Sequence, residues 1–303
     1  MVRKHGKVVS LSFNNLYLVA NLIKVILHLV ENSISDLQDR SKGKNRVNDM
    51  GDSLEAFITD IFAGTLGESD ESIRVKKYSQ VFSYLGNANN PPDLIIRDGD
   101  AIEVKKIKSF KSEIPLNSSY PKSKLLSGDP MITKDCRVVD GGKWTKDLIY
   151  IIGVVQKKKL KRLWLIGGDC YAADSETYKR VKDTISKGVK KIPLVEFSET
   201  KELGRVNKVD PLGITYLRIR GMWGISNPVK VYNYLNIDFN EMANLQVIAI
   251  MTTEKYCSFP KSDLTAIEQM SIVTAGLEVR DVRIKSPNNP ANLIDAKLIT
   301  YQS

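Results

Sequence analysis

Residues 90–109 read NPPDLIIRDGDAIEVKKIKS, and this stretch decides the fold. Two short apolar segments, 94–96 and 101–107, are separated by the pair Asp98-Gly99. An Asp-Gly pair between apolar runs is a strong signal for a tight β-hairpin turn. The stretch is therefore predicted to form two antiparallel strands.

Three charged residues interrupt the apolar pattern: Asp93 at the start of the first strand, and Glu103 and Lys105 within the second. Residues two apart in a strand point to the same face, so Glu103 and Lys105 share one. An acidic residue inside an Ile/Val strand is costly to bury unless something pairs with it. Two carboxylates and a lysine on one face can hold a hard cation with a water beside it.

This interpretation depends on the length of the hairpin loop. A two-residue loop at Asp98-Gly99 would place Asp93 and Glu103 on opposite faces. A three-residue loop, Arg97–Gly99, places the two carboxylates across from each other. That loop requires a left-handed residue in its last position, which Gly99 can supply. The metal-site interpretation therefore requires the three-residue loop, or a bulge with the same effect.

Composition limits the class of protein. The chain has 303 residues, of which 42% are hydrophobic and 26% charged, the balance of a globular protein with a sizeable core. The net charge of +10 and the pI near 9.3 favour a polyanionic partner, most commonly nucleic acid. The alternative is that the lysines only solvate the surface.

The three cysteines, Cys136, Cys170 and Cys257, are far apart, and with two histidines in the chain a zinc site is disfavoured. Because no disulfide is needed, the cytoplasm is the expected compartment. The most apolar N-terminal run, 16–30, contains polar residues and is too short to span a bilayer. No membrane association is expected, and an amphipathic helix over 16–38 is predicted instead.

A second helix is predicted to begin at Asp52 or Ser53, either of which can cap it, and to continue to Phe62. Glu55 lies beside the apolar stripe of this helix. It is either a carboxylate that supports a metal site or a first-turn residue favoured by the helix dipole.

Further elements follow from apolar patterning. A helix is predicted over 178–189, and Pro121 is placed in the first turn of another helix. Strands are predicted over 78–85, 148–155, 160–167, 213–219, 247–252, 279–284 and 296–301. The run 157–162 is interpreted as a solvated hairpin tip.

Two groups of side chains are candidates for DNA contact. The first follows the hairpin and consists of short donors and lysines: Asn117, Ser118, Ser119, Lys122 and Lys124. These residues equally suit an ordinary capped turn. The second is Arg218 and Arg220, two apart on a strand before a Gly/Trp loop, where arginines can read guanine. If the two arginines do not contact DNA, their face of the strand meets solvent or acidic residues.

Pro92-Asp93 followed by Glu103-Val104-Lys105 resembles the PD-(D/E)XK nuclease motif. Beyond the motif, several stretches resemble NgoPII-type restriction endonucleases: 90–96, 101–107, 116–122 and 216–223. The resemblance implies an α/β fold with a restriction-endonuclease-like core, a central mixed β-sheet flanked by helices. The expected division is an N-terminal helical arm (1–50), the nuclease core (51–228) and a β-rich C-terminal extension (229–303).

The resemblance also implies an activity. Asp93 and Glu103 would be ligands of Mg²⁺, Lys105 would polarise the attacking water, and Glu55 would be an outer carboxylate. The enzyme would be a homodimeric type II restriction endonuclease that hydrolyses double-stranded DNA at a GC palindrome such as GGCC. The alternatives are a PD-(D/E)XK nuclease of repair or junction resolution without sequence specificity, a DNA-binding protein without catalysis, and an enzyme acting on an anionic metabolite.

Overall fold

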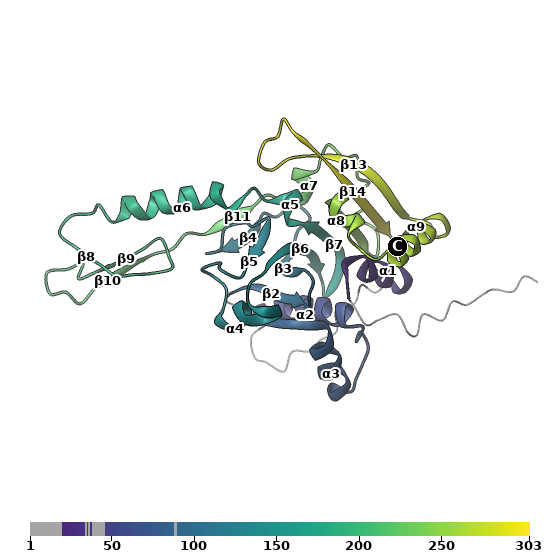
Figure 1. The fold of residues 1–303 in the computed structure, drawn as a ribbon, viewed down its shortest axis with the longest axis horizontal. Coiled ribbons are helices and arrows are strands. Elements are labelled where there is room, and N and C mark those ends of the chain that lie inside the picture. Colours follow the sequence, from purple (N-terminus) through teal and green to yellow (C-terminus); the bar gives the residue numbers. More distant parts are fainter. Residues whose placement is uncertain (1–19, 34, 36, 38–45, 88–89) are drawn as a thin grey trace, which may run out of the picture.

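A mixed β-sheet forms the centre of the molecule in the computed structural model, which describes residues 20–33, 35, 37, 46–87 and 90–303 (Figure 1). The helices are α1 (Leu22–Asn32), α2 (Arg46–Ala63), α3 (Glu71–Val81), α4 (Lys134–Val138), α5 (Gly168–Tyr171), α6 (Ser175–Val189), α7 (Pro228–Val231), α8 (Thr253–Cys257) and α9 (Lys261–Val273), with a 3-10 turn at Val139–Gly141. The strands are β1 (Phe82–Asn87), β2 (Asn90–Ile96), β3 (Ala101–Ile107), β4 (Ile114–Asn117), β5 (Lys124–Leu126), β6 (Thr145–Gln156), β7 (Lys159–Gly167), β8 (Glu196–Phe197), β9 (Gly204–Asn207), β10 (Tyr216–Ile219), β11 (Trp223–Ile225), β12 (Gln246–Thr252), β13 (Leu277–Lys285) and β14 (Leu293–Gln302).

The strand order of the central sheet is β1-β2-β3-β6-β7-β12-β14-β13, and β5 pairs with β6 beside this path. The pairs β3–β6 and β7–β12 are parallel, and the other pairs of this sheet are antiparallel. The predicted mixed sheet flanked by helices is confirmed. The C-terminal strands β12, β14 and β13 extend the same sheet.

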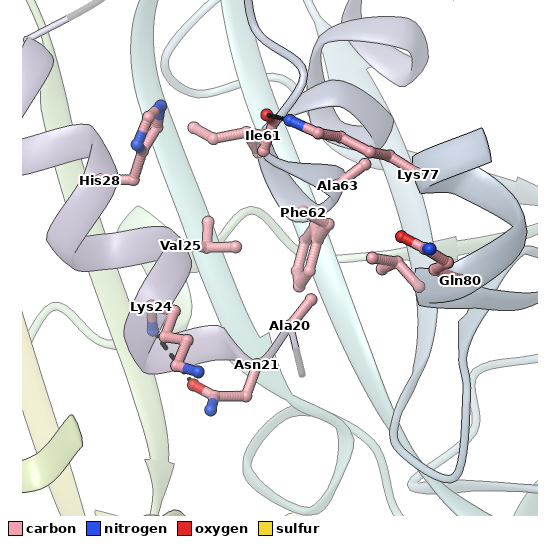
Figure 2. Close-up of a pocket in the computed structure, with 12 residues that line it drawn as sticks. Ala20, Asn21, Lys24, Val25, His28, Ile61, Phe62, Ala63, Lys77 and Gln80 are labelled. Atoms are coloured by element: carbon pink, nitrogen blue, oxygen red, sulfur yellow. Dashed lines mark hydrogen bonds between the residues drawn. The ribbon is translucent and has the colours of Figure 1, made fainter. Parts of the chain in front are cut away.

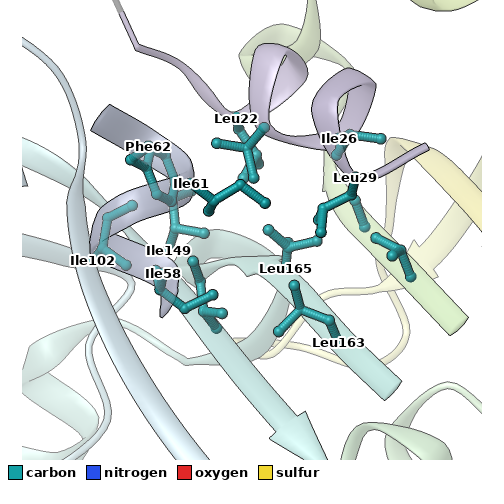
Figure 3. Close-up of a cluster of buried hydrophobic side chains, with 14 of the residues drawn as sticks. Leu22, Ile26, Leu29, Ile58, Ile61, Phe62, Ile102, Ile149, Leu163 and Leu165 are labelled. Atoms are coloured by element: carbon teal, nitrogen blue, oxygen red, sulfur yellow. The ribbon is translucent and has the colours of Figure 1, made fainter. Parts of the chain in front are cut away.

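Helices α1, α2 and α9 cover one face of the sheet. Their apolar side chains meet alternate residues of the central strands, and Figure 3 shows part of this core: Leu22, Ile26, Leu29, Ile58, Phe62, Ile102, Ile149, Leu163 and Leu165. Helix α2 lies very close to β6, since a Cβ placed on Gly153 would lie 2.6 Å from Cδ2 of Leu54. A glycine within a strand here serves the close approach of a helix.

The opposite face is covered by the small β4–β11 sheet, α4, α5 and α7. Its core is rich in aromatic rings, among them Tyr150, Trp164, Tyr171 and Tyr232. Because strand residues alternate between faces, this face of β3 also carries Glu103 and Lys105.

Helix α6 and the three-stranded sheet β8–β10 project from the body as an arm, residues 175–220 (Figure 1). None of the residues of α6 is buried, whereas β6 is buried along most of its length. The arm is therefore held by few core contacts. No helix among the described residues is long and apolar enough to cross a membrane.

The first helices differ from the sequence prediction. Helix α1 is shorter than 16–38: Asn21 caps it, and left-handed Ser33 (φ 45°) ends it. The predicted residues 16–19 lie outside the described part. Helix α2 begins at Arg46, so the predicted start at Asp52 or Ser53 is wrong.

Three further predicted elements need correction. The strand over 78–85 is wrong in its first half, because α3, capped by Asp70, continues to Val81. The segment 213–219 is a strand only from Tyr216, since Asp210 accepts from the Thr215 amide at 2.7 Å and forms a turn. Pro121 begins no helix. The predictions for 148–155, 160–167, 178–189 and the C-terminal strands are confirmed.

Candidate active site

The hairpin loop has three residues, the length that is needed to place Asp93 and Glu103 on the same face. The Ile96 amide donates to the Asp100 carbonyl at 2.9 Å, which closes the predicted three-residue loop Arg97–Gly99. The left-handed residue is Asp98 (φ 52°) and not Gly99, contrary to expectation. Gly99 instead provides space, because a Cβ there would lie 3.1 Å from the Ile96 side chain.

The register of the hairpin brings the predicted residues together. Leu94 pairs with Ile102 at the end of the ladder, so Asp93 and Glu103 occupy the next positions toward the open end. Lys105, two residues beyond Glu103, projects from the same face. The structure thus places the three residues of the motif side by side.

Direct hydrogen bonds fix this group. Lys105 Nζ donates to Glu103 Oε1 at 2.5 Å and to the Val104 carbonyl at 3.2 Å. The Val104 amide donates to Asp93 Oδ2 at 2.6 Å. The side chains of Glu103 and Lys105 are 13% and 19% exposed, so the group is shielded and yet reachable from solvent.

Burial and the neighbouring charges both shift the pKa values of this group. Burial, followed by the neighbouring Glu103 carboxylate, raises the pKa of Asp93 to about 8; Glu55 adds to the rise and Lys105 opposes it. Burial alone would lower the pKa of Lys105, but the Glu103 and Asp93 carboxylates outweigh it and the pKa is raised. Lys105 is therefore held as a cation. Glu55, on α2, acts on both residues.

The donor set suits a hard divalent cation. Asp93 and Glu103 offer carboxylate oxygens, and Glu103 Oε2 is buried without a hydrogen-bond partner among the described residues. Within that part of the chain no three His, Cys, Asp or Glu groups form a complete metal cage. Two carboxylates leave positions for water and phosphate oxygens, the coordination that Mg²⁺ prefers.

The residues that follow the hairpin have different environments. Asn117 and Ser118 are exposed, Ser119 is half-buried and Lys122 is 3% exposed. Lys124 forms an ion pair with Asp147, with 3.0 Å between Nζ and Oδ1. Ser119 and Lys122 line a small cavity of about 20 Å³ together with Glu103. Part of the predicted DNA-contacting group thus lies against the β2–β3 hairpin.

Sequence patterning missed Tyr150, which holds this segment. Its hydroxyl accepts from the Lys122 amide at 2.8 Å and donates to the Lys122 carbonyl at 3.0 Å. Tyr150 pairs with Glu103 across the parallel strands β3 and β6. Burial also lowers the pKa of Lys122, although Asp129 opposes the shift. The only sequence signal was a tyrosine within an apolar run.

Arg218 and Arg220 lie on the arm, apart from the hairpin. Both pair with Glu202, a residue that the sequence reasoning did not single out: Arg218 Nη2 and Arg220 Nε each lie 2.6 Å from Glu202 Oε1. Both arginine side chains remain about half exposed. The face of the strand that carries the two arginines therefore contacts Glu202 and solvent, and it remains accessible to a ligand.

A second pocket, of about 380 Å³, lies between α1, α2 and α3 (Figure 2). Its described lining is apolar, basic or amide-bearing and includes no carboxylate: Ala20, Asn21, Lys24, Val25, His28, Ile61, Phe62, Ala63, Gly64, Lys77, Gln80 and Val81. It therefore lacks the groups from which the hairpin site is built.

Comparison with known proteins identifies the family of the chain. The family described as NgoPII restriction endonuclease matches residues 20–285. The type II restriction enzyme NgoPII of Neisseria gonorrhoeae is 48% identical over 283 residues, which cover 93% of this chain and 99% of the relative. No solved structure matches the chain. The chain belongs to the NgoPII restriction endonuclease family and is a site-specific deoxyribonuclease.

Proposed function

We propose that this chain is a type II restriction endonuclease that hydrolyses double-stranded DNA in a Mg²⁺-dependent reaction at the β2–β3 hairpin. One observation carries the proposal: Asp93, Glu103 and Lys105 share one face, where Lys105 donates to Glu103 and the Val104 amide holds Asp93. The identity to a type II restriction enzyme supports the reaction class.

Asp93 and Glu103 would hold the cation, and Glu55 would add negative charge behind them. Bound Mg²⁺ would supply Lewis-acid stabilisation of the charge that develops on the phosphate. The raised pKa of Asp93 fits this role, because a cation would relieve the repulsion between the carboxylates.

Lys105 would position and polarise the attacking water. Because its pKa is raised, Lys105 is an ammonium group at neutral pH and acts as a hydrogen-bond donor. Its bond to Glu103 keeps the donor beside the metal ligands. In-line attack would leave a 5′-phosphate and a 3′-hydroxyl, as in the PD-(D/E)XK superfamily.

The sequence read by the enzyme is proposed from family resemblance to be a short GC palindrome, GGCC. A palindrome has twofold symmetry, which two copies of one chain match, so the active form is proposed to be a homodimer. The net charge of +10 favours binding to the DNA backbone. Asn117, Ser118, Ser119, Lys124, Arg218 and Arg220 are the proposed DNA contacts, whereas Lys122, also predicted from the sequence, is only 3% exposed and is not included.

The test is a Mg²⁺-dependent digest of mixed DNA, followed by sequencing of the cut ends. Discrete fragments ending at one palindrome are expected, and EDTA should stop the reaction. A smear would instead indicate the alternative, a nuclease without sequence specificity. The Glu103→Gln variant, prepared in the same way, controls for contaminating nucleases.

A further inference from the structure

Two residues with buried, unpartnered charged atoms line one small cavity beside the active site. Glu103 and Lys122 both line the cavity of about 20 Å³, and neither Glu103 Oε2 nor Lys122 Nζ makes a hydrogen bond within the described residues. A polar cavity of this size has room for about one water. Opposite charges on its two sides supply an acceptor and a donor for such a water.

The backbone of Lys122 is held firmly in this position. The Tyr150 hydroxyl bonds to both its amide and its carbonyl, and Tyr150 is the strand neighbour of Glu103. Gly168 packs against the same backbone: a Cβ there would lie 2.1 Å from the Ser123 carbonyl oxygen and 2.9 Å from that of Lys122. The position of Lys122 relative to Glu103 is thus fixed by neighbouring elements.

The other contacts of the Lys122 ammonium group provide no hydrogen bond that would offset the cost of burying its charge. Its ammonium lies 4.0 Å from Asp129 Oδ2, beyond hydrogen-bond distance, and 3.9 Å from the centre of the Tyr120 ring. A buried cation without a hydrogen bond destabilises the fold. A water shared with Glu103 would supply the missing bond for both groups.

We propose that Lys122 is a positioning residue for the metal ligand Glu103. One water in the cavity accepts from Lys122 Nζ and donates to Glu103 Oε2, while Lys105 binds Oε1. The carboxylate is then held at both oxygens. Because each carboxylate oxygen has more than one acceptor site, Oε2 can still face a cation. The proposal deepens the proposed function and depends on it.

The first measurement separates catalysis from DNA binding, using full-length enzyme with Mg²⁺ and cognate duplex. Lys122→Met should lower kcat about 10- to 100-fold, the scale for losing a partner behind a metal ligand, with KM for DNA within about threefold. Lys122→Gln, which can still donate to a water, should retain more activity. Lys146→Met is the matched control: Lys146 is also buried, pairs with Asp140 at 2.7 Å, and should keep the parental kcat.

The second measurement needs no catalysis. Thermal unfolding of the metal-free protein is measured for Lys122→Met, Glu103→Gln and the double variant, and likewise with Asp129→Asn in place of Glu103→Gln. The proposal expects non-additive effects for the Lys122–Glu103 pair that exceed those for Lys122–Asp129. The reverse ranking would make Lys122 a structural partner of Asp129 and would overturn the proposal.

The remaining outcomes are also decisive. A raised KM with unchanged kcat in Lys122→Met would mean that Lys122 contacts DNA directly, which overturns the positioning role. If Glu103→Gln is inactive but Lys122→Met cuts like the parent, only the Lys122 proposal fails. If Glu103→Gln itself cuts like the parent, the proposed function fails at its site.

Discussion

The β2–β3 hairpin has buried charges at both ends, and the two ends differ in how those charges are satisfied. At the loop end, Lys255 Nζ lies 2.5 Å from Asp100 and 2.9 Å from Asp147, and Lys146 lies 2.7 Å from Asp140. Burial raises the pKa of Asp100, but the Lys255 ammonium opposes the shift. Each of these three carboxylates, Asp100, Asp147 and Asp140, has a direct cationic partner.

At the open end the charges are left unbalanced. Lys105 pairs directly with Glu103, whose Oε2 has no hydrogen-bond partner among the described residues, whereas Asp93 is held by the Val104 amide. Buried polar groups are normally satisfied, so an unsatisfied cluster marks a site kept for a ligand. The two ends of the hairpin therefore differ in whether their carboxylates are paired with cations, rather than in the number of charges.

The largest expected effect is at the open end. Asp93→Ala or Glu103→Ala should reduce Mg²⁺-dependent cleavage below detection while the circular dichroism spectrum remains native. Asp100→Asn is the matched control at the loop end and should retain cleavage. Activity within a few-fold of the parent in either alanine variant would remove that residue from the site.

At the loop end the expected effect is on stability. Lys255→Met leaves Asp100 and Asp147 without their shared cation and should lower the free energy of unfolding by about 3 kcal/mol. The kcat for DNA should not change. Denaturant unfolding and steady-state cleavage of one preparation test both statements, and a large loss of kcat in folded enzyme would contradict the division between the two ends.

Lys105→Ala should slow cleavage by about a hundredfold or more, the scale for losing a positioned charge-stabilising donor. Lys106→Ala is the matched control, because Lys106 projects from the opposite face of β3. Single-turnover rates at saturating Mg²⁺ give the comparison. A greater loss in Lys106→Ala would mean that the assignment of faces is off by one residue.

The raised pKa of Asp93 predicts a pH dependence for the metal-free protein. A carboxyl whose folded pKa is raised adds stability below its unfolded pKa, near 3.8, and that stability is lost as the pH rises through about 8. Asp93→Asn should therefore melt progressively higher than the parent between pH 5 and pH 9, by several degrees at the alkaline end. Adding Mg²⁺ should raise the melting temperature of the parent and not that of the variant. A pH-independent difference would contradict the raised pKa of Asp93.

The smallest effect is expected on the arm, where the charges are exposed and paired. Arg218→Ala or Arg220→Ala should weaken binding to the cognate duplex about tenfold if the arginine reads a base, with little change for random DNA. A phosphate contact would weaken both duplexes and flatten the salt dependence. Measuring the binding of each variant to both duplexes at two salt concentrations distinguishes a base contact from a phosphate contact. Unchanged affinity would mean that the arginines pair with Glu202 and do not contact DNA.

The hairpin could be predicted because its signals are local. The Asp98-Gly99 pair and the alternation from Ala101 to Ile107 fix both the loop and the faces of the side chains within a few residues. Even there the left-handed residue was assigned to Gly99 and is Asp98, since aspartate also tolerates that conformation.

The rest of the site could not be predicted, because it depends on partners far along the chain. The environment of Lys122 is set by Tyr150, 28 residues later, through a strand pairing that no local pattern specifies. Short sequence patterns also gave a wrong prediction. The alternation near Tyr78 fits a strand, but Asp70 caps a helix that continues through Tyr78.

The parallel pairing of β3 with β6 has a consequence for how the chain folds. The hairpin can form from neighbouring residues, but the register of Glu103 with Tyr150 forms only after the connection 108–144 has crossed the sheet. Closing such a connection costs chain entropy before any contact rewards it, and non-local pairing of this kind slows folding. Lys122 lies within that connection, so Glu103 and Lys122 meet only in chains that have completed the crossover.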